Sequence, residues 1–212
     1  MTAHSYSSLS TFKQCPLRYY HQYVAKTYER VESPAMKEGL RVHKAFENYI
    51  MDRENLPEDL RRHAPVLDAL PKGTRAEIRM AVDRNWNPEH FFDHEAWFRG
   101  VIDVYACLGE KQAFILDRKT GRRRRDNTQL RFNAALVFAL RCDISAIAVS
   151  YSWTKSSELD SWVIERDQYE DIKGEIGELA RGAELARETL RYEGRPSRLC
   201  PWCDHFKKCE YA

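Results

Sequence analysis

Basic and acidic residues almost balance in this sequence. Its 212 residues include 34 Lys or Arg and 32 Asp or Glu, which gives a formal net charge of only +2. This balance excludes a protein whose whole surface attracts polyanions, so any nucleic-acid site must be local. The segment MTAHSYSSLSTFKQC lacks the apolar stretch of a signal peptide, and no apolar run is long enough to span a membrane. We therefore expect a cytoplasmic protein that does not bind membranes.

The sequence also lacks internal repeats, low-complexity linkers and the phosphate-loop motif G-x-x-x-x-G-K-S/T. A motor driven by nucleoside triphosphates is therefore not expected in this chain, and any helicase would be a separate partner. The length and the hydrophobic fraction of 43% fit one domain over residues 1–212.

Helical patterns dominate the first part of the chain. A serine-rich start followed by an aromatic-rich stretch predicts a serine-capped helix close to the first residue. Residues 36–51 place Leu40, His43 and Ile50 at helical spacing, so His43 should lie on or beside the apolar face. Residues 55–87 are expected to be mostly helical, with breaks at prolines.

Short β-branched and aromatic segments follow. HFFDHEAWFRG, VIDVYACLG and KQAFILDRKTG predict three consecutive, mainly antiparallel strands. Residues 126–140 predict a helix capped by Asp126 or Asn127. The segment ISAIAVSYSW then predicts a buried strand, DSWVIERD an edge strand, and residues 167–192 a long charged helix. This order predicts an α/β fold with a mixed central sheet flanked by helices on both faces.

Two carboxylates stand in otherwise apolar strands. Asp103 lies within RGVIDVY, and Asp117 ends the apolar run FILD. If the two strands pair across the turn at Gly109, these acids come within reach of one another, and a divalent cation would relieve their repulsion. Lys119 should point to the same sheet face as Asp117 because side chains alternate along a strand. An acid and a lysine so placed suit phosphodiester hydrolysis, with metal-activated water and a fixed positive charge.

These motifs together resemble the PD-(D/E)XK nuclease superfamily, and within it the RecB-like exonuclease branch with its restriction-endonuclease-like core. The resemblance is carried by SYSSLSTFKQCPLRYYHQY, GLRVHKAFE, GVIDVY, FILDRKTG, QLRFNAAL and the last three cysteines. It implies that His43, Asp103 and Asp117 hold Mg²⁺ or Mn²⁺, with the carbonyl of Arg118 as a further ligand. It also implies that Lys119 is the catalytic lysine of the motif.

Gln129 matches the glutamine of the helix that follows the motif in this branch, and is implied to be catalytic. Four positions later the branch usually has a tyrosine, whereas this sequence has Asn133. Any contribution of that tyrosine to substrate positioning is therefore not expected here.

Six cysteines in a cytoplasmic protein argue against a disulfide scaffold. Cys107 and Cys142 have apolar neighbours in sequence and are predicted to be small core residues. The layout of the other four resembles a branch that includes AddB-type helicase-nucleases and CRISPR-associated adaptation nucleases. The resemblance implies a [4Fe–4S] cluster that joins residues 1–35 to 193–212, outside a nuclease core at 36–192. A tetrahedral Zn²⁺ site is the alternative, and His205 could replace one thiolate. The four residues are Cys15, Cys200, Cys203 and Cys209.

Four consecutive arginines, Arg122, Arg123, Arg124 and Arg125, follow the lysine motif. Their position after the predicted metal site favours contacts with flanking phosphates, and a solvated turn is the alternative. The combined prediction is a metal-dependent DNA nuclease, an exonuclease that prefers single-stranded DNA. A helicase, a recombination protein or a CRISPR-adaptation protein would be its partner. A non-catalytic nucleic-acid-binding or scaffold module with a four-cysteine staple is the rival class.

Overall fold

A computed structural model describes residues 3–27 and 33–211 of the chain. The described residues form two compact units, one containing residues 33–172 and the other containing 4–27 and 173–211. The boundary at 172 falls inside helix α6 (Tyr169–Thr189). The proposed division into a core at 36–192 and a joined region at the two ends therefore stays a prediction.

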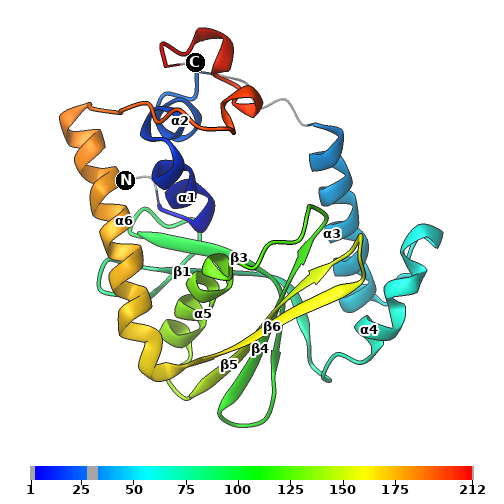
Figure 1. The fold of residues 1–212 in the computed structure, drawn as a ribbon. Helices are drawn as coiled ribbons and strands as arrows, with labels where there is room; N and C mark the ends of the chain where they lie inside the picture. The colour runs from blue at the N-terminus through cyan, green and yellow to red at the C-terminus, as the bar shows by residue number, and fades with distance from the viewer. Residues whose placement is uncertain (1–2, 28–32, 212) are drawn as a thin grey trace. The chain divides into compact units, whose positions relative to one another are not determined.

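A mixed six-stranded sheet forms the centre of the first unit, in the order β2-β1-β3-β4-β5-β6. Only β4 and β5 pair in parallel, and every other neighbouring pair is antiparallel. The predicted fold class is confirmed, and so is the edge position of the last strand (Figure 1). The strands are β1 (Arg75–Val82), β2 (Pro88–Glu89), β3 (Phe98–Cys107), β4 (Gln112–Lys119), β5 (Ala146–Trp153) and β6 (Glu158–Glu165).

The prediction of a mostly helical segment over 55–87 is wrong for its second half, where β1 runs from Arg75 to Val82. Helical turns occur earlier, in the 3-10 helix η2 (Glu58–His63) and in α4 (Ala64–Asp68). The residues of β1 are mostly good helix formers, but pairing with β3 along its length overrides that weak local preference. HFFDHEAWFRG is likewise mostly turns, and only its last three residues belong to β3.

Helix α5 (Thr128–Leu140) covers one face of the sheet. Its Phe132 ring packs edge-to-face on Phe98 of β3, with centroids 6.0 Å apart. Gly100 permits this close approach, because a Cβ there would lie 2.9 Å from Cδ1 of Leu136. Residues at alternate positions of β3, among them Asp103, therefore face the other side of the sheet.

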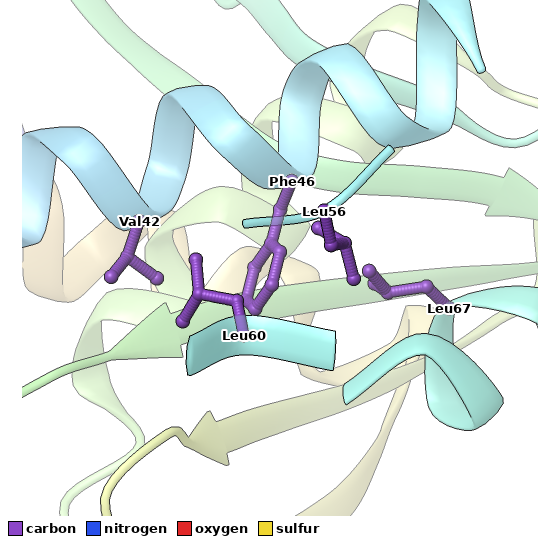
Figure 2. Packing of buried hydrophobic residues seen from close by; sticks show 5 residues of the cluster. All are labelled: Val42, Phe46, Leu56, Leu60 and Leu67. Carbon is purple, nitrogen blue, oxygen red and sulfur yellow. The ribbon is translucent and has the colours of Figure 1, made fainter. Parts of the chain in front are cut away.

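Helix α3 (Pro34–Asp52) lies on the opposite side of the strands from α5 (Figure 1). Ser33 caps the helix by accepting a hydrogen bond from the Met36 amide, and Pro34 occupies its first turn. Val42 and Phe46 of α3 pack on Leu56, Leu60 and Leu67 in a buried cluster (Figure 2). Each such side chain contributes about 1.5–3 kcal/mol by leaving water. This packing fixes the rotation of α3 about its axis, and with it the direction in which the His43 side chain points.

The second unit contains both ends of the described chain. Helix α1 (Tyr6–Gln14) begins with the predicted serine cap, where Ser5 and Ser8 bond each other's backbone amides. The helices α2 (Pro16–Tyr19) and η1 (Tyr20–Val24) follow, and the short 3-10 helices η4 (Cys200–Trp202) and η5 (Phe206–Lys208) close the chain. In the described part of the protein, no helix has the length and apolar character needed to cross a membrane.

Candidate metal centre and cysteine pocket

His43 joins α3 to the end of β4. Its Nε2–H donates to the carbonyl oxygen of Arg118 at 3.1 Å, which fixes the tautomer of a neutral ring. Its Nδ1 consequently faces two carboxylates, with Oδ2 of Asp103 at 3.2 Å and Oε1 of Glu77 at 3.8 Å. A lone pair on Nδ1 would be repelled by these oxygens, so a proton or a metal cation belongs between them.

Asp103 is buried where the strand ladder is interrupted. The pairing of β1 with β3 passes from Ala76–Val104 to Ile78–Ile102, and the pairing of β3 with β4 begins at Val104. The Arg118 amide donates to Oδ2 of Asp103 at 2.9 Å in place of a strand carbonyl. This hydrogen bond holds the carboxylate towards His43 and helps to compensate its burial.

Glu77 is a site residue that the sequence reasoning missed. It lies on β1 between the two pairs that flank Asp103, and its φ of 52° is in the left-handed region. A glutamate rarely adopts this conformation, so the surrounding structure must hold it there. An acidic residue in a segment that pairs with the Asp103 strand would have been the signal, had β1 been recognised as a strand.

One group of side chains in the described residues has three donor atoms close enough to share a metal ion. The atoms come from His43, Glu77 and Asp103, and all lie within 4.8 Å of one another. Glu77 and then Asp103 raise the pKa of His43, against the effect of burial, as expected where positive charge is favoured. One imidazole and two carboxylates fit Mn²⁺ well and can also hold Mg²⁺. The residues present therefore fit the predicted divalent metal.

Asp117 is fully enclosed and is held on both of its oxygens. Its Oδ1 lies 2.5 Å from Nζ of Lys119, and its Oδ2 accepts a hydrogen bond from Nε2 of Gln129 at 2.7 Å. Burial, reinforced by the nearby charge of Asp103, raises the pKa of Asp117 to about 6 despite Lys119 and His43. It lies outside the three-residue group, so its role as a metal ligand stays a prediction.

Gln129 links the two charged groups of the motif. Its Oε1 accepts a hydrogen bond from Nζ of Lys119 at 2.9 Å, while its amide donates to Asp117. The helix after the motif thus fixes both the lysine and the acid. Asn133, one turn further along α5, is buried and faces β3, where a Cβ on Gly100 would lie 3.1 Å from its Oδ1. Asn133 thus packs against the sheet at the position for which the resemblance implied a tyrosine.

The Arg118 side chain lies on the far side of β4 from Asp117. It is 1% exposed, and its guanidinium stacks over the Phe46 ring at 4.7 Å. None of its three side-chain nitrogens forms a hydrogen bond to the described residues. Burial lowers its pKa, while the charges of Asp103 and Glu77 oppose that change. The cation thus offsets part of the negative charge of the acids, while its carbonyl, a predicted metal ligand, orients His43.

Arg123 has different contacts from the other three arginines of the run. Arg123 forms ion pairs with Asp160 and Glu158 of β6, including a 2.8 Å bond from Nε to Oδ2 of Asp160. This pairing ties the loop after β4 to the edge strand, so Arg123 is committed to the protein itself. The other three remain exposed, and phosphate binding stays a prediction for them: Arg122, Arg124 and Arg125.

One pocket of the second unit is lined by all four of the cysteines assigned to a cluster, Cys15, Cys200, Cys203 and Cys209. The Arg195 amide points at Sγ of Cys15 at 3.4 Å, and the Ser197 amide at Sγ of Cys200 at 3.2 Å. Such donors stabilise thiolates that bind a metal.

The spacing of these sulfurs bears on the choice of metal. A tetrahedral zinc site with Zn–S bonds of about 2.3 Å places its sulfurs roughly 3.8 Å apart. Among the described residues, no three cysteine or histidine ligand atoms of the second unit lie within 4.8 Å of one another. An iron–sulfur cluster binds each thiolate through a different iron and so spaces them more widely. The [4Fe–4S] cluster therefore stays a prediction, and so does its zinc alternative.

The prediction that Cys107 and Cys142 are core residues is wrong, because both are exposed. Cys107 ends β3, and its Sγ lies 3.5 Å from the Tyr105 hydroxyl and 3.6 Å from Nη1 of Arg141. These two contacts lower its pKa. Cys142 lies in the turn after α5. Apolar neighbours in sequence misled the prediction, because both cysteines fall where an element ends.

Comparison with known proteins identifies the family of the chain. The family model of the PD-(D/E)XK nuclease superfamily matches residues 3–210. The crystal structure of SSO0001 matches with a TM-score of 0.55 at 14% identity, over 99% of this chain and 86% of that one. A Eubacterium rectale structure named "Putative exonuclease" matches with a TM-score of 0.55 at 10% identity, over 97% and 87%. No curated protein matches the sequence significantly. The chain belongs to the PD-(D/E)XK nuclease superfamily.

Proposed function

We propose that this protein is a metal-dependent DNA nuclease that hydrolyses phosphodiester bonds as an exonuclease with a preference for single strands. The observation that carries the proposal is the orientation of His43. Its Nε2–H is committed to the Arg118 carbonyl, so Nδ1 faces the carboxylates of Asp103 and Glu77. Bound there, a divalent cation would lower the pKa of a water and neutralise phosphate charge.

The other residues of the motif prepare the reacting groups. Lys119 is fixed by Asp117 and Gln129, which leaves its ammonium group at the end of β4, one residue after the Arg118 carbonyl that binds His43. From this position Lys119 can orient the attacking water or stabilise charge that develops on the phosphate. Asp117 joins the ligand set if its carboxylate exchanges its contact with Lys119 for the cation.

The choice of an exonuclease rests on the family and on the name of the Eubacterium rectale structure. At 10% identity, that structure supports the fold alone. The word exonuclease in its name is the reason for proposing this activity rather than another nuclease activity. A nuclease that acts on ends needs a grip on the strand beyond the scissile bond, which the exposed arginines after β4 can supply.

We further propose that the four cysteines of the second unit hold a [4Fe–4S] cluster. The pocket lined by Cys15, Cys200, Cys203 and Cys209 supports this assignment. These thiolates come from both ends of the chain, so the cluster would act as a structural staple of the second unit rather than as a reactant.

One digestion series tests the function. Single and double DNA strands, labelled at the 5′ or the 3′ end, are incubated with the purified protein in Mn²⁺, in Mg²⁺ and in EDTA. Metal-dependent release of mononucleotides or short products from single-stranded ends is expected. Binding without cleavage under every metal condition would instead favour the non-catalytic module.

A further inference from the structure

We propose that an exposed strip of arginine and phenylalanine beside the metal centre binds the unpaired DNA strand that leads to the scissile phosphate. We call Arg79, Phe91, Phe92 and Arg99 the arginine–phenylalanine strip. The inference rests on the proposed nuclease function and names how its substrate is held. None of the four residues belongs to the sequence motifs of the metal centre.

The strip continues the sheet face on which the metal centre lies. Arg99, Val101 and Asp103 occupy alternate positions of β3, on the face turned away from α5. Arg79 of β1 is the register partner of Val101, which is itself exposed. From Asp103 to Arg99 the strand rises by about 13 Å. A strand of a few nucleotides could therefore contact the strip while one of its phosphates reaches the metal centre.

Two phenylalanine rings that pack edge-to-face and two guanidinium groups build the strip. The Arg79 guanidinium lies 5.4 Å from the Phe92 ring centre and 5.9 Å from that of Phe91. Arg99 lies 5.0 Å from the Phe91 ring and donates to the Phe91 carbonyl at 3.1 Å. Phe92 nevertheless remains 74% exposed, so most of its ring is open to a ligand. Cation–π contacts thus pre-position the rings without covering them.

The charges of the strip are not neutralised by carboxylates. Neither Arg79 nor Arg99 forms an ion pair with a carboxylate in the described residues, whereas Arg41, Arg123 and Arg141 all do. A single exposed phenylalanine would be unremarkable. An open aromatic ring next to arginines that no carboxylate neutralises is the combination that binds unpaired bases and their phosphates. The bases of a duplex are already stacked on one another, so they cannot stack on these phenylalanine rings.

Binding is measured by fluorescence anisotropy with a labelled oligothymidylate, in a Lys119→Ala background so that the strand stays intact. Phe92→Ala should weaken binding by roughly 5- to 100-fold, because one base–aromatic stack is lost. Phe92→Leu should weaken it nearly as much, since leucine keeps the apolar bulk but has no ring face. Leu159→Ala, which removes a 52% exposed side chain from the opposite edge strand, is the matched control and should leave affinity unchanged.

Arg79→Gln should flatten the dependence of log affinity on log salt by about 0.7, the loss of one phosphate contact to a single strand. Duplex affinity should be unaffected by Phe92→Ala. Unchanged strand affinity in Phe92→Ala and Arg79→Gln, both folded by their melting temperatures, would overturn the strip. Cleavage by the wild-type protein in Mn²⁺ reports the nuclease function separately. A wild type that binds the strand through Phe92 but never cleaves would refute the nuclease and support the strip.

Discussion

His43 and Arg118 meet across 75 residues of sequence through a 3.1 Å hydrogen bond from the imidazole Nε2–H to the backbone carbonyl. The bond fixes which nitrogen of His43 can take a cation. It also links α3 to the motif strand β4. The buried cluster of Val42, Phe46 and Leu60 holds α3 in place and so helps to position His43. The fold thus sets the orientation of the His43 ring, and Asp103 and Glu77 supply the negative charge that attracts a cation.

Replacement of Lys119 tests the role of its ammonium group. Lys119→Ala should lower kcat by roughly 100- to 1000-fold, the usual cost of losing one preorganised donor to developing charge. KM for a single-stranded substrate should change little. The measurement is the initial rate of nucleotide release in Mn²⁺, with circular dichroism to verify folding. Lys44→Ala is the matched control, because Lys44 is an exposed lysine on α3 next to His43 and forms an ion pair with Glu47.

Asp117→Asn tests the burial of that carboxylate. The pKa of Asp117 is raised from 3.8 to about 6, so the folded chain binds more protons than the unfolded chain between these values. The stability gained from protonation is therefore fully present only below pH 3.8 and is lost as the pH rises through about 6. In EDTA, Asp117→Asn should unfold at higher urea than the wild type at about pH 7.5, by roughly 1–3 kcal/mol.

The advantage of Asp117→Asn should shrink as the pH falls and vanish at about pH 3, where the wild-type group is mostly neutral in both states. Mn²⁺ should reverse the order of stability at about pH 7.5, because the variant lacks one predicted ligand and so gains less stability from the ion. A variant that is less stable than the wild type in EDTA at every pH would show that the ion pair with Lys119 outweighs burial.

Glu77→Gln tests the residue that the motifs did not reveal. Its carboxylate oxygen would be replaced by a neutral amide, so the Mn²⁺ concentration needed for half-maximal rate should rise by about tenfold or more. The rate at saturating Mn²⁺ should recover most of the wild-type value if Glu77 acts through the ion. Glu95→Gln, on an exposed turn of the same unit, should change neither value. An unaltered Mn²⁺ requirement in Glu77→Gln would remove it from the ligand set.

The sequence predicted the site best where strand geometry determines it. Asp117 and Lys119 share a face by simple alternation, and Asp103 lies near enough to raise the pKa of Asp117 because β3 and β4 are neighbours. Glu77 escaped because the residues of β1 favour helix locally, and only its pairing with β3 makes it a strand. The role of Arg123 also depends on a distant acid, Asp160, that no local pattern reveals. Local chemistry was therefore predictable, whereas partners set by tertiary pairing were not.

Cys203→Ser tests the cluster in the second unit. Anaerobically purified wild-type protein should be brown and contain iron and acid-labile sulfide, and the variant should lose both. Its melting temperature should fall by roughly 10 °C or more, because several kcal/mol of metal-binding free energy contributes to folding and each is worth about 2–4 °C. Cys142→Ser, an exposed thiol of the first unit, should keep the colour and the stability of the wild type. A colourless wild type with one zinc per chain would show that the cysteines hold zinc instead of a cluster. A metal-free wild type that is as stable as Cys203→Ser would show that they hold no structural metal.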